Sequence, residues 1–446
     1  MQHSDSDNRT VQALKQQQCL AEEFLPGGVA GSARFNPALG YALTVSRASG
    51  GRIYDITGKE YIDFNMSHGA TFLGHGHPAV RQALEAALDS GVIAGYETEQ
   101  NVALARKICE IIPCAQMVRL ANSGTEGTML ALRLARAYTG KPKLLKFWGH
   151  FHGLHDYVMY NAHSPLAPVS RGFRVTLQRE SAGIPAVLDQ LVEVIPWQDE
   201  DALLSVLRQQ GDQIGAIMME PINYNSGGIV ASKAYMEFVR RLASEHHIVL
   251  IYDEVLSAFR TGVSCAQGYY GVTPDLCVIS KAISNGVPLA VVAGKREIMS
   301  QVAPFGEVTH SGTTTGNLLS VSAALACLEE ITSPGFYDHI YSVAEHLYSG
   351  LSELFIRAGI PARVQGVGAR FGLFFGYTQE IKNFTDTLKH DGVLASQFLR
   401  ACARNGVYFH SYGTLASGHH GIASAHTIED IDEALNRIED ALREMT

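Results

Sequence analysis

The chain has 446 residues, of which 46% are hydrophobic and 18% charged, a composition typical of a globular protein with room for two or three domains. Its formal net charge of −9 gives no electrostatic reason to expect a nucleic acid or an acidic membrane surface as a partner. No apolar run approaches the ~20 residues that cross a bilayer, and the polar, acidic beginning of the sequence lacks the pattern of a secretion signal.

The first 65 residues predict a polar, partly helical lead-in, then turns and a hairpin. Pro26-Gly27-Gly28 is a turn signal, and Arg34 follows in a short loop. Residues 51–64 have the pattern of two half-buried strands around an Asp-Ile-Thr-Gly-Lys turn. We assign residues 1–65 to an N-terminal segment that belongs to a small domain.

Strand-like and helix-like stretches alternate from about residue 100 to 330. The expected strands are 117–120, 144–147, 214–219, 248–252, 276–279 and 289–293, and one expected helix is 126–138. This alternation predicts an α/β fold with a mostly parallel sheet flanked by helices. We expect residues 66–330 to form the large domain.

After Pro334 the pattern changes to a long helix followed by probable strands in 363–375 and 406–409. The last helix is expected to begin with a capping box formed by Thr427 and Asp430. Residues 331–446 therefore predict a C-terminal α+β small domain, which the N-terminal segment completes.

Two buried strands end in residues with opposite charge. The run 248–252 is followed by Asp253, and the run 276–279 is followed by Ser280 and Lys281. Ligands of parallel sheets bind outside the carboxyl ends of the strands. A lysine amine and a carboxylate at that edge suit a pyridoxal phosphate cofactor, although both are also common as solvated loop residues.

Other strand ends carry groups that suit the same cofactor. Ser123, Gly124 and Thr125 precede a helix, where backbone N–H groups bind phosphate, or where a serine simply caps the helix. Residues 309–317 form a second hydroxyl- and glycine-rich loop that is either a phosphate contact or a turn. Phe151 follows another strand, where an aromatic ring can lie on a flat cofactor. The histidines beside Phe151 are feasible metal ligands, but no second cluster has ligand spacing, so we expect no metal.

Together these motifs resemble the class III aminotransferases, which are pyridoxal 5′-phosphate (PLP) enzymes of fold type I. The similarity runs from about residue 25 to the C-terminus and is greatest to the branch with glutamate-1-semialdehyde aminomutase and the β-amino-acid and D-phenylglycine aminotransferases. The residues that carry it are Pro26-Gly27-Gly28-Val29, Leu73-Gly74-His75-Gly76-His77-Pro78, Asn122-Ser123-Gly124-Thr125-Glu126, Phe151-His152-Gly153, Asp253-Glu254-Val255, Lys281 and Gly312-Thr313.

The resemblance implies a role for each matched residue. Lys281 is the Schiff-base lysine and proton shuttle, and Asp253 pairs with the pyridinium nitrogen. The other implied cofactor contacts are Val255 and Phe151 on the two ring faces, Asn225 or alternatively Asn223 at the ring hydroxyl, Ser123, Gly124 and Thr125 at the phosphate, and Thr313 reaching that phosphate from the partner subunit of a homodimer.

The resemblance also implies substrate contacts. Arg34 matches an arginine that binds a substrate carboxylate, with Arg260 as the reserve candidate, because residues 408–413 contain no arginine. His68 stands where the aminomutases have an aromatic residue, which counts against aminomutase activity.

The expected activity is transfer of an amino group between a carboxylate-bearing α- or β-amino acid and an oxo acid. An aminomutase or an amino-acid epimerase would use the same residues. A decarboxylase and an inactive protein of the same fold are further alternatives. The seven cysteines are scattered and never spaced C-x-x-C, so we expect reduced thiols and a cytoplasmic protein.

Overall fold

The computed structural model describes residues 2–163, 175–413 and 418–445, which form two compact units. The central unit comprises Pro78–Tyr337 and Ile381–Asp386. The terminal unit comprises Met1–His77, Asp338–Glu380 and Thr387–Thr446, so both ends of the chain contribute to it.

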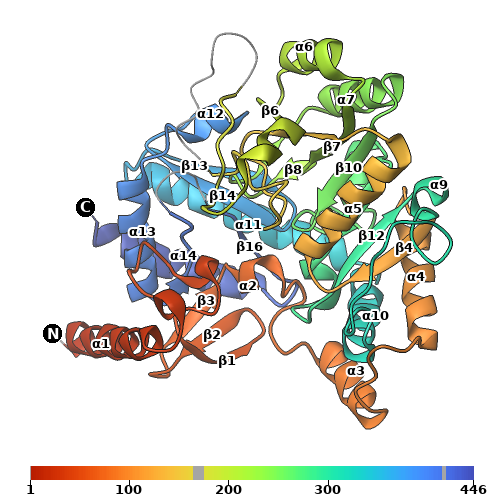
Figure 1. Ribbon diagram of the computed structural model, residues 1–446. Coiled ribbons are helices and arrows are strands. Elements are labelled where there is room, and N and C mark those ends of the chain that lie inside the picture. Colours follow the sequence, from red (N-terminus) through yellow and green to blue (C-terminus); the bar gives the residue numbers. More distant parts are fainter. Residues whose placement is uncertain (1, 164–174, 414–417, 446) are drawn as a thin grey trace. The chain divides into compact units, whose positions relative to one another are not determined.

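The central unit contains a seven-stranded sheet with the order β4-β12-β11-β10-β7-β5-β6 (Figure 1). Its strands are β4 (Met117–Ala121), β5 (Lys143–Phe147), β6 (Val192–Ile195), β7 (Ile214–Met219), β10 (Val249–Glu254), β11 (Leu276–Ile279) and β12 (Ala290–Gly294). All neighbours pair in parallel except β12, which is antiparallel to both β11 and β4. The sheet is therefore mostly parallel, as the sequence predicts.

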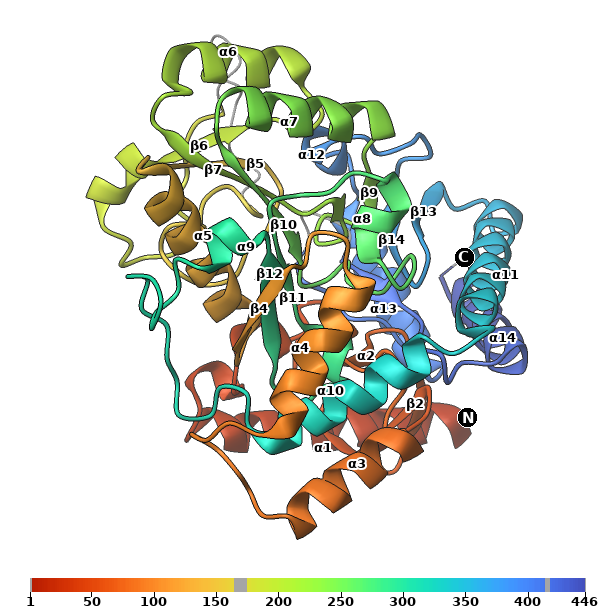
Figure 2. The same cartoon turned by 90° about the vertical axis from the view of Figure 1, so that its right-hand side faces the viewer.

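The helices of the central unit surround this sheet, and Figure 2 shows α5 lying along one face of it. They are α3 (Pro78–Asp89), α4 (Glu99–Ile111), α5 (Gly124–Thr139), α6 (Glu200–Gln210), α7 (Lys233–Glu245), α8 (Cys265–Tyr270), α9 (Arg296–Met299) and α10 (Leu318–Ile331), with 3₁₀ turns η3 (Ala186–Leu191) and η4 (Lys281–Ser284) and a short ribbon of β8 (Ile222–Asn223) and β9 (Ile229–Val230).

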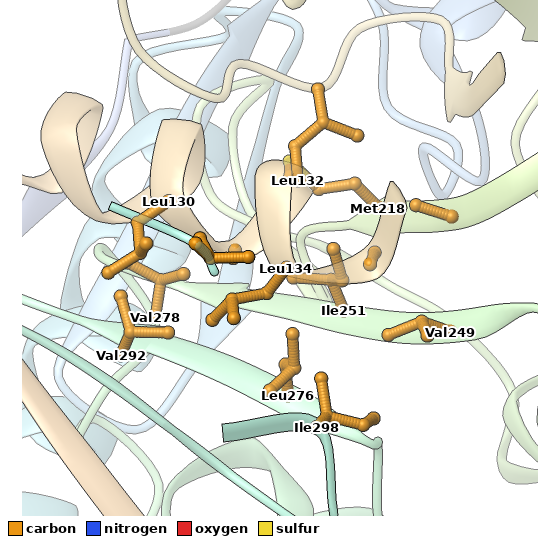
Figure 3. Close-up of a cluster of buried hydrophobic side chains, with 14 of the residues drawn as sticks. Leu130, Leu132, Leu134, Met218, Val249, Ile251, Leu276, Val278, Val292 and Ile298 are labelled. Carbon is orange, nitrogen blue, oxygen red and sulfur yellow. The ribbon is translucent and has the colours of Figure 1, made fainter. Parts of the chain in front are cut away.

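Helix α5 supplies one half of the main core. Its side chains Leu130 and Leu134 point toward the strands, where they meet residues such as Ile251 and Val278 (Figure 3). These four side chains are fully buried. Because every residue of β7, β10, β11 and β12 is also buried, the strands read in the sequence as continuous apolar runs.

The structure differs from the sequence-based expectation at two strands. Strand β6 is absent from the expected set, because its Glu193 interrupts a short run at the edge of the sheet. Strand β10 continues through Asp253 and Glu254, which the sequence placed just beyond its end. Both carboxyl groups are nevertheless buried, and they lie at the strand's carboxyl end.

The terminal unit is built on two small sheets, ordered β1-β2-β3-β15 and β13-β14-β16. The predicted hairpin is present as β2 and β3, and Thr427 and Asp430 form the predicted capping box. Its elements are α1 (Gln2–Glu22), η1 (Pro26–Gly28), η2 (Ser32–Arg34), β1 (Val45–Ser49), β2 (Arg52–Asp55), β3 (Glu60–Asp63), α2 (Met66–Gly69), β13 (Ala362–Val367), β14 (Arg370–Phe375), α13 (Gly392–Arg404), β15 (Val407–Tyr408), β16 (His420–Gly421) and α14 (Ile428–Arg443). Two helices contain residues of both units, α11 (Phe336–Arg357) and α12 (Phe384–Thr387).

Within the described ranges, every helix is too short or too polar to cross a membrane. All seven cysteines fall inside these ranges and none forms a disulfide.

Candidate active site

The strand register brings five loops to one edge of the central sheet. Ala121 pairs with Ala290, Val291 with Ile279, and Ile279 with Glu254. On the other side of β10, Tyr252 pairs with Met219, and β5 runs parallel to β7. The loops that follow β4, β5, β7, β10 and β11 therefore all leave from the carboxyl edge, where α/β sheets bind their ligands.

Asp253 lies on β10, and Lys281 follows the neighbouring strand β11 at this edge. Asp253 pairs in register with Val278, which is three residues before Lys281. Lys281 begins η4 with a φ of +51°, in the left-handed region that residues other than glycine seldom adopt. The residue before it, Ser280, is held by its hydroxyl, which donates a hydrogen bond to the Leu289 carbonyl at 2.7 Å. Strained backbone of this kind gathers at functional sites.

The Asp253 carboxylate is 3% exposed and is fixed from two sides. His152 Nδ1 lies 2.7 Å from its Oδ2, and the Val255 N–H donates to its Oδ1 at 3.0 Å. Burial lowers the pKa of His152, although the bond to Asp253 opposes this effect, so we infer a neutral ring that donates from Nδ1. Two donors leave acceptor capacity on the carboxylate for a third partner such as a pyridinium N–H.

The N-terminus of α5 has the form of a phosphate site. Ser123 caps the helix, because its Oγ accepts the Glu126 N–H at 3.2 Å. A Cβ added to Gly124 would lie 2.7 Å from the Val255 side chain, so the backbone of the first turn passes close to β10. Ser123 therefore caps the helix, which is one of the two roles that the sequence suggests for it. The N–H groups of the first turn also keep the orientation that suits an anion.

The loops after β5 and β7 hold each other through one buried carboxylate. Glu220 accepts the Phe151 N–H at 2.8 Å and the Asn225 Nδ2 at 2.9 Å. Burial raises the pKa of Glu220 to about 8, with the nearby Asp253 adding to the shift. The Asn223 amide is fully buried and donates to the Gly149 carbonyl at 3.0 Å, whereas Asn225 is partly exposed.

The loop before α10 packs against the start of α5. His310 Nε2 lies 2.9 Å from Glu126 Oε1, and the Asn122 amide donates to Thr315 Oγ1 at 3.1 Å. Thr313 is exposed beside these contacts. Its exposure leaves the hydroxyl accessible to a second molecule.

Arg34 and His68, the expected substrate contacts, belong to the terminal unit. Arg34 is exposed in η2, and none of the described acidic groups forms an ion pair with it. Met66, Ser67 and His68 all have positive φ, and His68 Nδ1 lies 2.6 Å from the Tyr412 hydroxyl. The sheet register that brings the other candidates together does not extend to this unit.

Two further expectations concern arginine and metal. The reserve arginine, Arg260, is 1% exposed and donates Nε to the Leu256 carbonyl at 3.1 Å, so its guanidinium is embedded in the central unit. Among the described residues, no group of three or more His, Cys, Asp or Glu side chains is placed to hold a metal ion.

Two partners in this site carry no clear signal in the sequence. His152 belongs to a histidine-rich loop that first suggests metal ligation, yet its observed partner is Asp253. Glu220 follows a strand end like the other candidates, but its bonds to Phe151 and Asn225 depend on the fold. A buried charge directly after an apolar run is the one clue that points to such residues.

These groups fit PLP. The cofactor needs an amine for its aldehyde, a carboxylate for its pyridine nitrogen and an anion site for its phosphate. Lys281, Asp253 and the first turn of α5 provide all three at one sheet edge. A Cβ on Gly153 would lie 2.6 Å from Thr125 Oγ1, so the loop that carries Phe151 also approaches that turn closely.

Comparisons with known proteins agree with this fit. The family described as Aminotransferase class-III matches residues 36–442. A glutamate-1-semialdehyde 2,1-aminomutase from Methanobrevibacter smithii is 36% identical over 423 residues, which cover 95% of this chain and 96% of that protein. The crystal structure of an omega-transaminase from Sphaerobacter thermophilus has a TM-score of 0.90 and 28% identity, with 97% of each chain covered. A transaminase solved with PLP bound has a TM-score of 0.86 and 27% identity, covering 97% of this chain and 98% of that one.

The fold is therefore that of the fold-type-I PLP enzymes, with the large mostly parallel sheet at its centre. The match to the family covers most of the sequence, and the relative from Methanobrevibacter smithii covers nearly all of it. This chain belongs to the class III aminotransferase family, and its cofactor is pyridoxal 5′-phosphate.

Proposed function

We propose that the protein is a transaminase that moves an amino group between a carboxylate-bearing α- or β-amino acid and an oxo acid. The observation that carries the proposal is the register of β10 and β11, which pairs Asp253 with Val278, three residues before Lys281. When bound, PLP supplies an aldehyde that takes up amino groups and a ring that withdraws electrons from the substrate carbon.

In this proposal Lys281 would hold the cofactor through its amine and would move the proton at the substrate carbon. Asp253 accepts a hydrogen bond from the pyridine nitrogen and keeps the ring protonated. His152 is a positioning residue, because its 2.7 Å contact fixes one oxygen of Asp253. His152→Ala should then shift the pH profile of the reaction, while His152→Asn, which retains a donor, restores part of it.

We propose the remaining cofactor contacts from the resemblance to the family and from the position of these residues at the same sheet edge. Val255 and Phe151 would cover the two ring faces, and Ser123, Gly124 and Thr125 would hold the phosphate. Asn225 would contact the ring hydroxyl, because no described donor bonds its Oδ1, whereas both ends of the Asn223 amide are engaged, with the Gly149 carbonyl and the Ser226 N–H. Asn225→Ala should change the visible absorption of the bound cofactor more than its affinity.

The deciding experiment compares Lys281→Ala with Lys233→Ala, which removes an exposed lysine from α7. Loss of the amine at 281 should abolish turnover and the visible absorption of lysine-bound cofactor, with the far-ultraviolet circular dichroism unchanged. The control variant should match the parent protein. Turnover and absorption that persist in Lys281→Ala contradict the proposal.

We propose that Arg34 binds the substrate carboxylate and that His68 faces the substrate. The support is an exposed guanidinium without an ion-pair partner among the described residues. Arg34→Ala should raise KM for amino acids while leaving KM for simple amines nearly unchanged, whereas Arg81→Ala, an exposed control on α3, should affect neither. Equal effects on both donor classes remove Arg34 from this role.

The second candidate is an intramolecular aminomutase, which the 36% identity to a protein of that name supports. The same cofactor residues serve both reactions. A transaminase supplied with an amino donor but no oxo acid completes one half-reaction and stops. Multiple turnovers of an amino aldehyde without an added oxo acid would identify the aminomutase instead.

We further propose a cytoplasmic homodimer in which Thr313 completes the phosphate site of the partner. Two exposed apolar side chains near Thr313 support this: Val92 is 68% exposed and Tyr96 80%. A Cβ added to Gly95 would lie 3.8 Å from the Thr313 carbonyl oxygen, and the Leu318 N–H donates to the Ile93 carbonyl at 3.0 Å, so this segment lies beside the Thr313 loop. Tyr96→Asp should lower the molar mass measured by light scattering from a dimer to a monomer; an unchanged mass contradicts this interface.

A further inference from the structure

A cavity of about 170 Å³ lies in the terminal unit, among α1, residues 39–43, β3 and the end of α13. None of the residues proposed for the cofactor or the substrate lines it. Its walls combine two features: a floor of aliphatic and tyrosine side chains and a rim of lysine and arginine side chains.

One face of α1 packs against the rest of the terminal unit and fixes the position of the cavity wall that this helix forms. Leu14 is fully buried, and the Gln18 Oε1 accepts the Ala42 N–H at 3.1 Å. Because Val11 and Lys15 are four residues apart, they share the neighbouring face of the helix, and both line the cavity.

The floor is apolar. Leu39 and Leu43 line the cavity and pack against the cluster that contains Tyr61. Tyr41 is 6% exposed and Tyr61 3%. The Tyr61 hydroxyl donates to Asp55 Oδ2 at 2.9 Å, so the floor has little need for a polar ligand atom.

Four cations form the rim, and the described residues that line the cavity include no carboxylate. Lys59 Nζ is 5.6 Å from the centre of the Tyr61 ring and donates to the Arg404 carbonyl at 2.7 Å. The Arg404 guanidinium pairs with Glu444, which lies outside the lining, at 2.8 Å.

The other two cations lack a neutralising group. No described carboxylate lies within ion-pair distance of Lys15. Arg400 donates its Nε to the Ala38 carbonyl, and no described acceptor bonds its two terminal nitrogens. The Asp55 carboxylate behind Tyr61 is already bonded to the Tyr61 hydroxyl and does not line the cavity. Positive charges at one rim repel one another, and an anion placed among them relieves that repulsion.

We propose that this cavity binds a small organic carboxylate with an apolar body about the size of one aromatic ring. An apolar cavity of ~150 Å³ accommodates a benzene molecule, so the available volume suits one ring or a branched aliphatic chain. The apolar body rests on the floor, and the carboxylate lies among Lys15, Lys59 and Arg400. Because the walls belong to both α1 and α13, an occupant links the N-terminal helix to the remainder of the terminal unit.

The probe is phenylacetate, with phenylacetamide as its neutral isostere, added to the holoenzyme. Hydrogen exchange of peptides from residues 9–22 and 399–405 reports binding here, whereas the visible spectrum of the cofactor reports binding at the active site. Phenylacetate should slow exchange in both peptides by at least about threefold. Phenylacetamide and inorganic phosphate should have little effect, because each lacks one of the two matched features.

Three variants separate the cavity from nonspecific binding. Lys15→Met combined with Arg400→Met should weaken phenylacetate binding by at least about tenfold. Ala403→Phe, which fills the cavity and leaves the charges in place, should abolish the protection. Lys233→Met combined with Arg241→Met, an exposed pair on α7, should behave like the parent protein.

Several outcomes would overturn the assignment. Unchanged protection in the double variant or in Ala403→Phe rules the cavity out as the site. Equal protection by phenylacetamide excludes a role for the charges, and equal protection by phosphate indicates a general anion-binding surface. These readouts do not depend on turnover, so the result stands apart from the proposed transamination.

Discussion

Replacing Lys146 should test how the fold holds the loop that carries Phe151 and His152. Lys146 lies in β5, is fully buried, and donates to three backbone carbonyls of the following loop. The acceptors are the carbonyls of His150 at 2.8 Å, Val158 at 3.0 Å and Tyr160 at 2.5 Å. An ammonium has three N–H donors, so this set satisfies it completely.

The loss of folding stability in Lys146→Met is the difference between the hydrogen bonds that are lost and the desolvation cost that is recovered. Three buried carbonyls lose their donor, at roughly 1–3 kcal/mol each. Removal of a buried charge returns several kcal/mol of desolvation cost, and the methionine side chain fills most of the volume. The net destabilisation should be about 3–5 kcal/mol, which is the range for breaking a buried charged contact.

The assay is thermal unfolding at about pH 6, because burial lowers the pKa of Lys146 to about 7 and the ammonium form prevails below that value. Lys146→Met should lower Tm by roughly 5–10 °C and weaken PLP binding, since the loop beside the cofactor loosens. Lys143→Met is the control on the same strand: its 3.1 Å pair with Glu193 is partly exposed, and its loss leaves no buried backbone carbonyl without a donor, so it should cost only about 1 kcal/mol. A Tm for Lys146→Met equal to that of Lys143→Met would refute this account of the loop.

Two other substitutions test separate parts of the structure. Burial lowers the pKa of His390 to about 4, and its Nδ1 accepts the Phe375 N–H at 3.1 Å. In the unfolded chain the imidazole has a pKa near 6.5, so this histidine lowers the stability of the fold as the pH falls from about 6.5 to about 4. His390→Asn keeps a hydrogen-bond acceptor and should therefore shift the midpoint of acid unfolding to lower pH. An unchanged midpoint contradicts this. Gly124→Ala places a Cβ 2.7 Å from Val255 and should weaken PLP binding on the order of tenfold, as measured by cofactor titration. Adding Val255→Ala should restore most of the loss, and the absence of any rescue would show that the contact is not the cause.

The strands that the sequence predicts best are those buried on both faces. The expected bounds of β7 and β11 match the structure residue for residue, because both are continuous apolar runs bounded by polar residues. Strand β6 is missed because it lies at the sheet edge and has only four residues, one of which is the partly exposed Glu193. Lys146 was a further clue, since a charge within a buried strand requires partners from elsewhere in the fold.

The parallel sheet explains why the sequence predicts which strand-end residues lie together. Hydrogen bonding among these residues explains why the sequence does not predict the role of each one. A parallel sheet aligns the carboxyl ends of its strands, so Asp253 and Lys281 are neighbours once their strands are identified. No such rule separates Asn223 from Asn225, which follow the same strand two residues apart. What separates them is that the Gly149 carbonyl engages one amide and Glu220 positions the other at the partly exposed edge. The sheet therefore determines which residues meet, and hydrogen bonding among their polar groups determines which side-chain atoms stay open: no described donor bonds the Asn225 Oδ1, whereas both ends of the Asn223 amide are bonded.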